Sequence, residues 1–247
     1  MRTEKLLLGN SYELIKNIPD KSIDLIVTDP PYDMETGARK TGSRLEQNAR
    51  RVFDELIDSD IVKAVNNEIL TEFLRVLKTP NLYIWCNGRQ IPQYVDFFVL
   101  KHRCKMDVLI WQKTNPIPLY NNTYLTDKEY CLYFRQGGYC CPKTYRDAKT
   151  VFTEQTNKKD KELYKHPTIK PLNIIKTIIA NSTREGDMVL DPFMGSGTTG
   201  VACKELGLDF TGIEISEKWY KVAKDRMNDA TFENISKNQT TIYDFLN

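Results

Sequence analysis

The chain has 247 residues, 40% of them hydrophobic and 28% charged, which is ordinary globular composition with room for a sizeable core. Its 35 basic and 33 acidic residues nearly cancel, so any nucleic-acid surface must be a local patch and not a global field. The length favours one domain with insertions.

Cysteine, histidine and apolar patterns narrow the class further. The six cysteines form no C-x-x-C pair and only two histidines are present, so neither a zinc site nor a disulfide framework is expected. The amino-terminal apolar run is too short for a signal peptide, and no stretch approaches the ~20 apolar residues of a membrane span. We therefore expect a cytoplasmic protein without a metal.

Buried strands and amphipathic helices alternate along the chain. Strands are predicted at residues 22–29, 81–87, 105–113, 129–136, at the start of 187–200, and at 209–216. Helices are predicted at residues 67–78, 93–102, 171–182 and 217–227. This alternation predicts an α/β fold with a mainly parallel sheet.

Two polar segments interrupt the alternation. Residues 34–51 form one such segment, in which the part from Arg39 to Arg51 carries five Lys and Arg against one acid, and residues 139–165 carry seven against four. Long insertions of this kind are solvated loops or functional surfaces. Their basic character leaves a nucleic-acid surface about as probable as a solvated loop.

The stretch IVTDPPYD, residues 26–33, ends a predicted core strand on an acid and two prolines. Proline cannot donate to a sheet ladder, so the strand must stop there. The corner is either a simple turn or a loop that presents fixed acceptors and a flat ring to a substrate.

A glycine loop follows the strand near residue 187. Gly195 and Gly197 lie between this strand and a helix start, where backbone can approach a ligand closely. Glu214 ends the next strand, and an acid about 20 residues beyond such a loop commonly binds ribose hydroxyls. The loop lacks the G-x-x-x-x-G-K-[ST] pattern, which excludes an NTP-hydrolysing phosphate loop. A nucleoside-bearing cofactor is indicated.

The acid Asp191 before the loop argues against a bound pyrophosphate and suits a cationic group. S-adenosylmethionine carries an ammonium, which the Asp191 carboxylate can bind. It also carries a carboxylate, which can face the helix start at Thr198 and Thr199.

Together, DPPY (29–32), HPTIKP (166–171) and DPFMGSGTTG (191–200) resemble, in this order, the S-adenosylmethionine-dependent DNA amino-methyltransferases of the beta type. The resemblance implies a Rossmann-like class I fold with a seven-stranded, mostly parallel mixed sheet and helices on both faces. It divides the chain into a catalytic half (1–138), a short target-recognition segment (139–165) and a cofactor-binding half (166–247). The family usually has Gly-Asp where this chain has Gly9-Asn10.

The chemistry of amino methylation explains the proline corner. Asp29 and the Pro30 carbonyl can accept the two N–H groups of an aromatic amine and sharpen its lone pair. Pro31 keeps the corner rigid, and Tyr32 offers a stacking face worth ~1–3 kcal/mol. The target base must be flipped out of the duplex to reach them.

Further site residues follow from the resemblance. The expected cofactor contacts are Asn10, His166, Thr168, Lys170, Asp191, Phe193, Gly195, Ser196, Gly197, Thr198, Thr199 and Glu214. For His166, a loop leading into a helix is an equally good interpretation. We expect Arg39, Lys40 and Arg44 to bind DNA phosphates, and Lys143, Arg146 and Lys149 to help read the DNA sequence.

The resemblance favours the 6-amino group of adenine in a specific double-stranded site. The 4-amino group of cytosine, a protein glutamine, and a non-catalytic DNA-binding role remain as alternatives. The recognition sequence, a homodimer and a cognate restriction endonuclease stay open.

Overall fold

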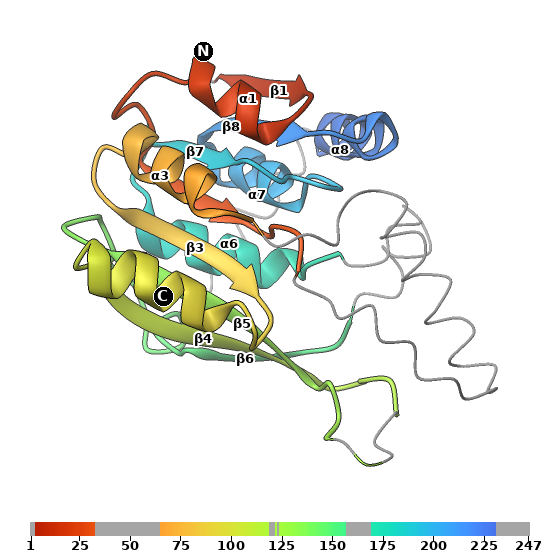
Figure 1. Ribbon diagram of the computed structural model, residues 1–247. Helices are drawn as coiled ribbons and strands as arrows, with labels where there is room; N and C mark the ends of the chain where they lie inside the picture. Colours follow the sequence, from red (N-terminus) through yellow and green to blue (C-terminus); the bar gives the residue numbers. More distant parts are fainter. Residues whose placement is uncertain (1–2, 33–64, 119–121, 123, 157–168, 231–247) are drawn as a thin grey trace.

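The computed structural model describes residues 3–32, 65–118, 122, 124–156 and 169–230. Its centre is an eight-stranded sheet in the order β1-β8-β7-β2-β3-β5-β4-β6 (Figure 1). The strands are β1 (Glu4–Leu8), β2 (Leu25–Thr28), β3 (Asn81–Cys86), β4 (Lys105–Lys113), β5 (Lys128–Arg135), β6 (Val151–Glu154), β7 (Met188–Asp191) and β8 (Asp209–Glu214).

Helices precede or follow most of these strands. They are α1 (Ser11–Leu14), the 3-10 helix η1 (Ile15–Asn17), α3 (Asn67–Val76), α4 (Ile91–Tyr94), the π-helix η2 (Val95–Lys101), α6 (Leu172–Ser182), α7 (Thr198–Leu206) and α8 (Glu217–Asp229). The helix predicted at 93–102 is thus an α-helical turn that continues in π-helical geometry. None of the described helices is long and apolar enough to cross a membrane.

The sheet is mixed and mostly parallel, as expected. Strands β1, β8, β7, β2 and β3 run parallel to one another, and β5 runs antiparallel to both β3 and β4. Strand β6 pairs in parallel with β4 at the edge.

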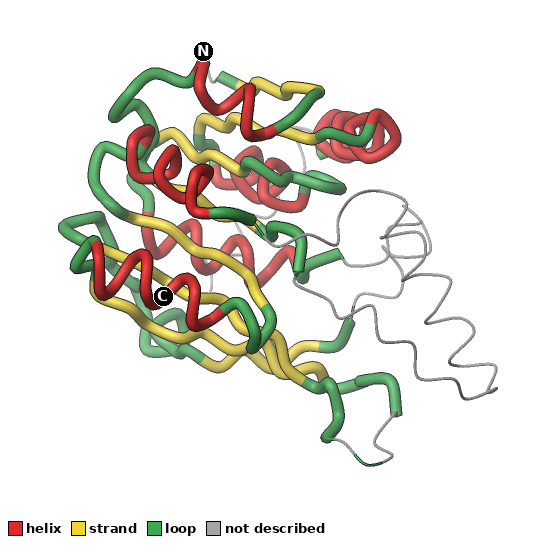
Figure 2. Tube along the Cα trace, in the orientation of Figure 1, coloured by secondary structure: helices red, strands yellow, loops and turns green. Residues whose placement is uncertain are grey.

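Two apolar cores lie on the two faces of the sheet, and helices cover both (Figure 2). Neighbouring residues of one strand enter opposite cores: Ile26 packs on one face with α3, and Leu25 and Val27 pack on the other with α6 and α7. This alternation follows from the two-residue period of a strand. It explains why central strands read as continuous apolar runs.

The sheet has eight strands, where the resemblance implied seven. Residues 151–154, predicted as part of an insertion, form the edge strand β6, and residues 4–8, for which no strand was predicted, form β1. Strand β6 has alternating exposed and half-buried residues, and it is defined by its pairing with Ile110–Lys113 of β4. A four-residue edge strand has little apolar signal of its own.

Candidate active site

The carboxyl ends of the central parallel strands form one edge of the sheet, and the two principal motifs lie there. Asp29 directly follows β2, and Asp191 is the last residue of β7. The two strands are neighbours, with Ile26 opposite Leu190. The Thr28 hydroxyl donates a hydrogen bond of 2.9 Å to Asp191 Oδ1, so the catalytic and cofactor motifs are in direct contact.

Backbone geometry explains the glycines of the cofactor loop. Gly195 and Gly197 have φ values of 49° and 80°, a region that side chains disfavour. A Cβ on Gly197 would lie 2.8 Å from Ala223 Cβ of α8. The loop therefore turns sharply, and α7 begins at Thr198 without a side-chain cap. The uncapped N–H groups of this helix can face an anionic group.

The two acids predicted to bind the cofactor also hold this loop in shape. Glu214 accepts hydrogen bonds from the Gly195 N–H at 2.9 Å and the Ser216 N–H at 2.8 Å. Asp191 accepts from the Phe193 N–H at 3.1 Å and the Thr199 hydroxyl at 2.7 Å. Their cofactor contacts stay predictions, and carboxylate oxygens have further lone pairs for them.

Burial changes the acidity of both groups. Asp191 is buried and receives hydrogen bonds only from uncharged groups, and burial raises its pKa to about 7. Burial also raises the pKa of Glu214, against its backbone hydrogen bonds. A ligand ammonium beside Asp191 would favour the ionised carboxylate.

Arg226 of α8 holds the glycine loop by hydrogen bonds, a role that was not predicted from the sequence. Its Nη1 donates to the Ser196 carbonyl at 2.7 Å, to the Ser196 hydroxyl at 2.9 Å and to the Thr198 hydroxyl at 3.1 Å. Arg226 lies on the buried face of α8 together with Ala223. The sequence feature that could have identified Arg226 is its position as a charged residue on an otherwise apolar face of the predicted helix.

The amino-terminal segment borders the loop. The Gly9 N–H donates to the Glu214 carbonyl at 2.9 Å, and the Ser11 hydroxyl donates to the Pro192 carbonyl. Asn10 Oδ1 caps α1 by accepting from the Tyr12 N–H at 2.9 Å. The predicted cofactor contact of Asn10 stays a prediction.

A network of charged groups surrounds the catalytic tetrapeptide. Lys170 Nζ lies 2.5 Å from Asp29 Oδ2, 3.0 Å from the Tyr32 hydroxyl oxygen and 3.1 Å from Glu129 Oε2. Glu129 Oε1 is 2.7 Å from Lys113 Nζ, and its Oε2 accepts from the Tyr32 hydroxyl at 3.2 Å. Lys170 was expected among the cofactor contacts, but its contacts within the described residues belong to the tetrapeptide and its surroundings.

Burial and charge act against each other in this network. Burial raises the pKa of Asp29, and the Lys170 ammonium opposes this only in part. Burial acts in the same direction on Glu129, but Lys170 and Lys113 outweigh it and lower its pKa to about 2. Burial favours neutral Lys170, but Asp29 and Glu129 prevail and raise its pKa, which keeps it charged at neutral pH.

The two oxygens of the predicted catalytic acid differ in their hydrogen bonds within the described part of the chain. Asp29 Oδ1 is buried and accepts no hydrogen bond from the described residues, nor does Trp85 Nε1 donate one. The remainder of the corner is held firmly, because Gln90 Nε2 donates to the Pro31 carbonyl at 3.0 Å. Glu129 and Lys113 had no sequence signal because their meeting depends on the pairing of β5 with β4, and Gln90 had none because its partner Pro31 is 59 positions away in the chain.

The predicted DNA-reading segment, residues 139–165, begins at the edge of the sheet opposite the catalytic edge. Strand β5 pairs antiparallel with β3 over six residues, from Tyr130 opposite Cys86 to Arg135 opposite Asn81, so its end at Arg135 lies at the edge of the sheet opposite the catalytic edge. The following chain is hydrogen-bonded at Cys141 and Asp147 to Asn181 in the last turn of α6. The chain near Lys143 therefore lies toward the opposite edge, whereas Arg146 acts electrostatically on Glu154, which pairs with Lys113 at the carboxyl end of β4. The DNA contacts of Lys143, Arg146 and Lys149 stay predictions.

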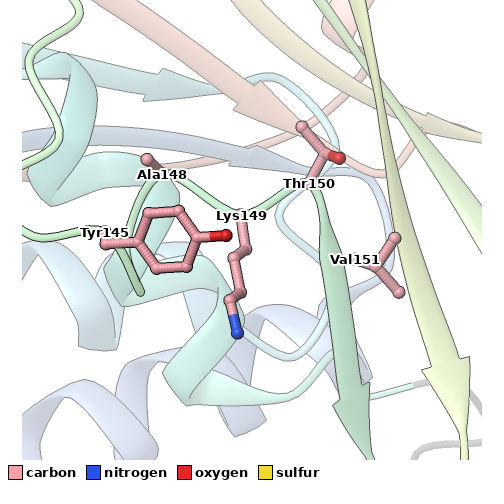
Figure 3. Close-up of a pocket in the computed structure, with 5 residues that line it drawn as sticks. All are labelled: Tyr145, Ala148, Lys149, Thr150 and Val151. Carbon is pink, nitrogen blue, oxygen red and sulfur yellow. The ribbon is translucent and has the colours of Figure 1, made fainter.

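A shallow pocket beside this segment lies away from Asp29. It has a volume of about 300 Å³ and is lined by Tyr145, Ala148, Lys149, Thr150 and Val151 (Figure 3). Arg39, Lys40, Arg44, His166 and Thr168 lie outside the described residues.

An open α/β sheet with a glycine loop and an acid at its carboxyl edge defines a class I methyltransferase fold, and the comparisons agree. The family model for DNA methylases of the N6/N4 type matches residues 23–225. The chain therefore belongs to this family: it is a DNA methyltransferase that uses S-adenosylmethionine.

Individual proteins support the same assignment. The type II methyltransferase M2.LlaDCHI of Lactococcus lactis subsp. cremoris is 34% identical, over 90% of this chain and 88% of its own. M2.DpnII of Streptococcus pneumoniae is 32% identical with the same coverage. The crystal structure of the M1.HpyAVI–SAM complex matches with a TM-score of 0.66 and 28% identity, over 92% of this chain and all of that one.

Proposed function

We propose that the protein methylates the 6-amino group of adenine in a specific double-stranded DNA site, with the target base flipped out of the helix. The observation that carries this proposal is the buried Asp29 Oδ1 beside Tyr32, which has no hydrogen-bond partner among the described residues. A buried acceptor without a donor is costly, and the amino group of a bound base would supply one.

Each residue of the corner has a role in this reaction. Asp29 Oδ1 and the Pro30 carbonyl accept the two amino hydrogens, which draws the nitrogen lone pair out of ring conjugation. Tyr32 stacks on the base and fixes its plane. The bound cofactor supplies an electrophilic methyl carbon. The nitrogen would take up the methyl group as the carbon–sulfur bond breaks with its electron pair going to sulfur, and the surplus amino proton would pass through the Asp29 carboxylate to solvent.

Positioning and fixed dipoles contribute the rate enhancement in this scheme. No covalent bond to the enzyme forms, because transfer is a single in-line displacement between two bound molecules. Asp191, Glu214 and the start of α7 would bind the ammonium, the ribose and the carboxylate of the cofactor. The Thr28–Asp191 hydrogen bond couples the two halves of the site.

Two of the relatives are named type II methyltransferases, and we propose a modification enzyme of a restriction–modification system. Cytosine remains the competing target, because its 4-amino group suits the same pair of acceptors. A solved neighbour, PvuII methyltransferase, is named cytosine-N4-specific, but its 16% identity shows the fold alone.

Product analysis tests the proposal. The purified protein is incubated with S-adenosylmethionine and a mixed-sequence DNA duplex, and the digested nucleosides are separated by mass spectrometry. We expect N6-methyladenine among the nucleosides, and sequencing of the undigested methylated duplex with detection of modified bases should place it at one short sequence. Detection of N4-methylcytosine would show that cytosine is the target base. Methylation of protein alone would overturn the proposal.

A further inference from the structure

We infer that Lys170 and Glu129 are positioning residues for methyl transfer, which hold the Asp29 carboxylate so that one oxygen is bound within the protein and the other is left for the target amine. This inference rests on the proposed function and names the groups that prepare its catalytic acid.

The two oxygens of Asp29 have opposite surroundings. Oδ2 is 2.5 Å from Lys170 Nζ, and Oδ1 is buried without a partner among the described residues. A carboxylate that could rotate freely would present either oxygen to a substrate. The contact with Lys170, whose side chain is 7% exposed, removes that freedom and leaves Oδ1 as the acceptor.

Glu129 holds Lys170 and Tyr32 at the same time. Its Oε2 lies 3.1 Å from Lys170 Nζ and accepts from the Tyr32 hydroxyl at 3.2 Å. Its Oε1 is held by Lys113 Nζ at 2.7 Å. The Glu129 carboxylate on β5 therefore orients both the Lys170 ammonium, which contacts Asp29, and the ring of Tyr32.

The network is charge-balanced, and this balance has a measurable consequence. Asp29 and Glu129 carry two negative charges, and Lys170 and Lys113 carry two positive charges. Lys170 opposes protonation of Asp29, whereas Glu129 favours it. Removing one or the other should therefore move the titration of Asp29 in opposite directions.

The pH dependence of single-turnover methyl transfer tests this inference. The reaction needs ionised Asp29, so protonation of Asp29 sets an acidic limb in the rate. In Lys170→Gln we expect this limb to move to higher pH, with at least a ~10²-fold loss of rate at neutral pH. In Glu129→Gln we expect the limb to move to lower pH.

Two further measurements separate positioning from other roles. Calorimetry should show that Lys170→Gln binds S-adenosylmethionine within twofold of the wild-type affinity. Lys176→Gln serves as the matched control, because Lys176 and Glu205 form an equally short pair of 2.5 Å between α6 and α7. We expect this control to lower the melting temperature without moving the acidic limb.

Each result has a defined meaning. Limbs that stay in place, or that move in the same direction in both variants, would overturn the inference. A tenfold loss of cofactor affinity in Lys170→Gln with an unmoved limb would make Lys170 a cofactor residue instead. If Lys170→Gln does not fold, the direction of the Glu129→Gln shift decides. If the wild-type protein transfers no methyl group to DNA, the proposed function itself is contradicted.

Discussion

Asp29 and Asp191 end neighbouring parallel strands, yet their surroundings give them different chemistry. Asp29 lies against the Lys170 ammonium, whereas the donors around Asp191 are two hydroxyls and a backbone N–H. An adjacent cation favours an ionised carboxylate, and burial disfavours it. Asp29 is therefore prepared to accept hydrogen bonds from a neutral amine, and Asp191 is prepared to gain a cationic partner.

Replacement of Asp29 tests the first role. We expect Asp29→Ala to lower the single-turnover rate by at least ~10²-fold while cofactor affinity is retained, because this side chain contacts the base and not the cofactor. Transfer of a labelled methyl group and calorimetry measure the two quantities. Substantial turnover by the purified variant would remove Asp29 from catalysis.

The pH dependence of cofactor binding tests Asp191. Its pKa of about 7 in the folded protein exceeds its usual value of 3.8, so folding takes up a proton. Stability from this group is therefore present at low pH and is lost as pH rises from about 4 to about 7. An ammonium ligand favours the ionised form, so affinity should increase up to about pH 7.

Calorimetry in buffers of different ionisation enthalpy measures the proton released on binding below pH 7. Asp191→Asn should bind the cofactor more weakly and release no proton. Proton release that is equal in the variant and the wild type would show that another group titrates.

Glu214 is expected to bind ribose hydroxyls in addition to the Gly195 N–H. Glu214→Ala should weaken cofactor binding by about 1.5–3 kcal/mol, the usual value of hydrogen bonds to a charged group. Glu217→Ala is the control, because Glu217 is an exposed acid at the start of α8 that pairs with Lys221. Equal affinities for the wild type and Glu214→Ala would exclude Glu214 from the site.

At the scale of elements, the packing of α7 against α8 determines the shape of the cofactor loop. Gly197, Ala223 and the Arg226 side chain meet where the two helices approach each other. This contact brings backbone groups of the loop to the sheet edge, and it leaves no space for a side chain at position 197.

A pair of glycine variants separates backbone strain from steric overlap. Gly197 and Gly186 have φ values of 80° and 81°, but of the two only Gly197 has atoms within 4 Å of the position that a Cβ would occupy. Gly186→Ala should cost about 1 kcal/mol of unfolding free energy from strain alone. Gly197→Ala should cost about 1–3 kcal/mol more and weaken cofactor binding. Chemical denaturation measures both, and equal losses would contradict a close contact with Ala223.

At the scale of the whole molecule, the net charge of +2 cannot attract DNA from a distance, so DNA binding depends on local patches. The sequence predicts Arg39, Lys40 and Arg44 as phosphate contacts near the flipped base. Cys141 and Asp147 are hydrogen-bonded to Asn181, near the end of α6 that lies away from Asp29, and we therefore expect this segment to contribute little to DNA reading.

Binding titrations at several salt concentrations compare the two groups. Replacing Arg39, Lys40 and Arg44 with glutamine should lower affinity for cognate and random duplexes alike, and should reduce the salt slope by about 3. The Lys143→Gln/Lys149→Gln variant should keep the wild-type ratio of cognate to random affinity. A reduced ratio would restore the sequence-based assignment of residues 139–165 to DNA reading.

Much of the fold and the class of reaction can be read from the sequence because their signals are local. Buried runs and helical periodicity predict the central strands and the principal helices, which depend on neighbouring residues. The tetrapeptide 29–32 and the loop 191–200 are contiguous, so their order and chemistry are visible without coordinates. The edge strand β6 escaped this reasoning because pairing with β4 defines it.

What only the tertiary structure decides is which distant residues meet. Lys170 is 141 positions from Asp29 in the chain, and Arg226 is 30 positions from Ser196. Glu129 reaches Tyr32 because β5 lies beside β3 in an antiparallel register. The same reversal takes the chain after β5 to Asn181 near the end of α6, where the Cys141 N–H is bound. Hydrophobic period and motif order determine where strands and loops occur, but strand order and direction determine which side chains converge on the catalytic acid.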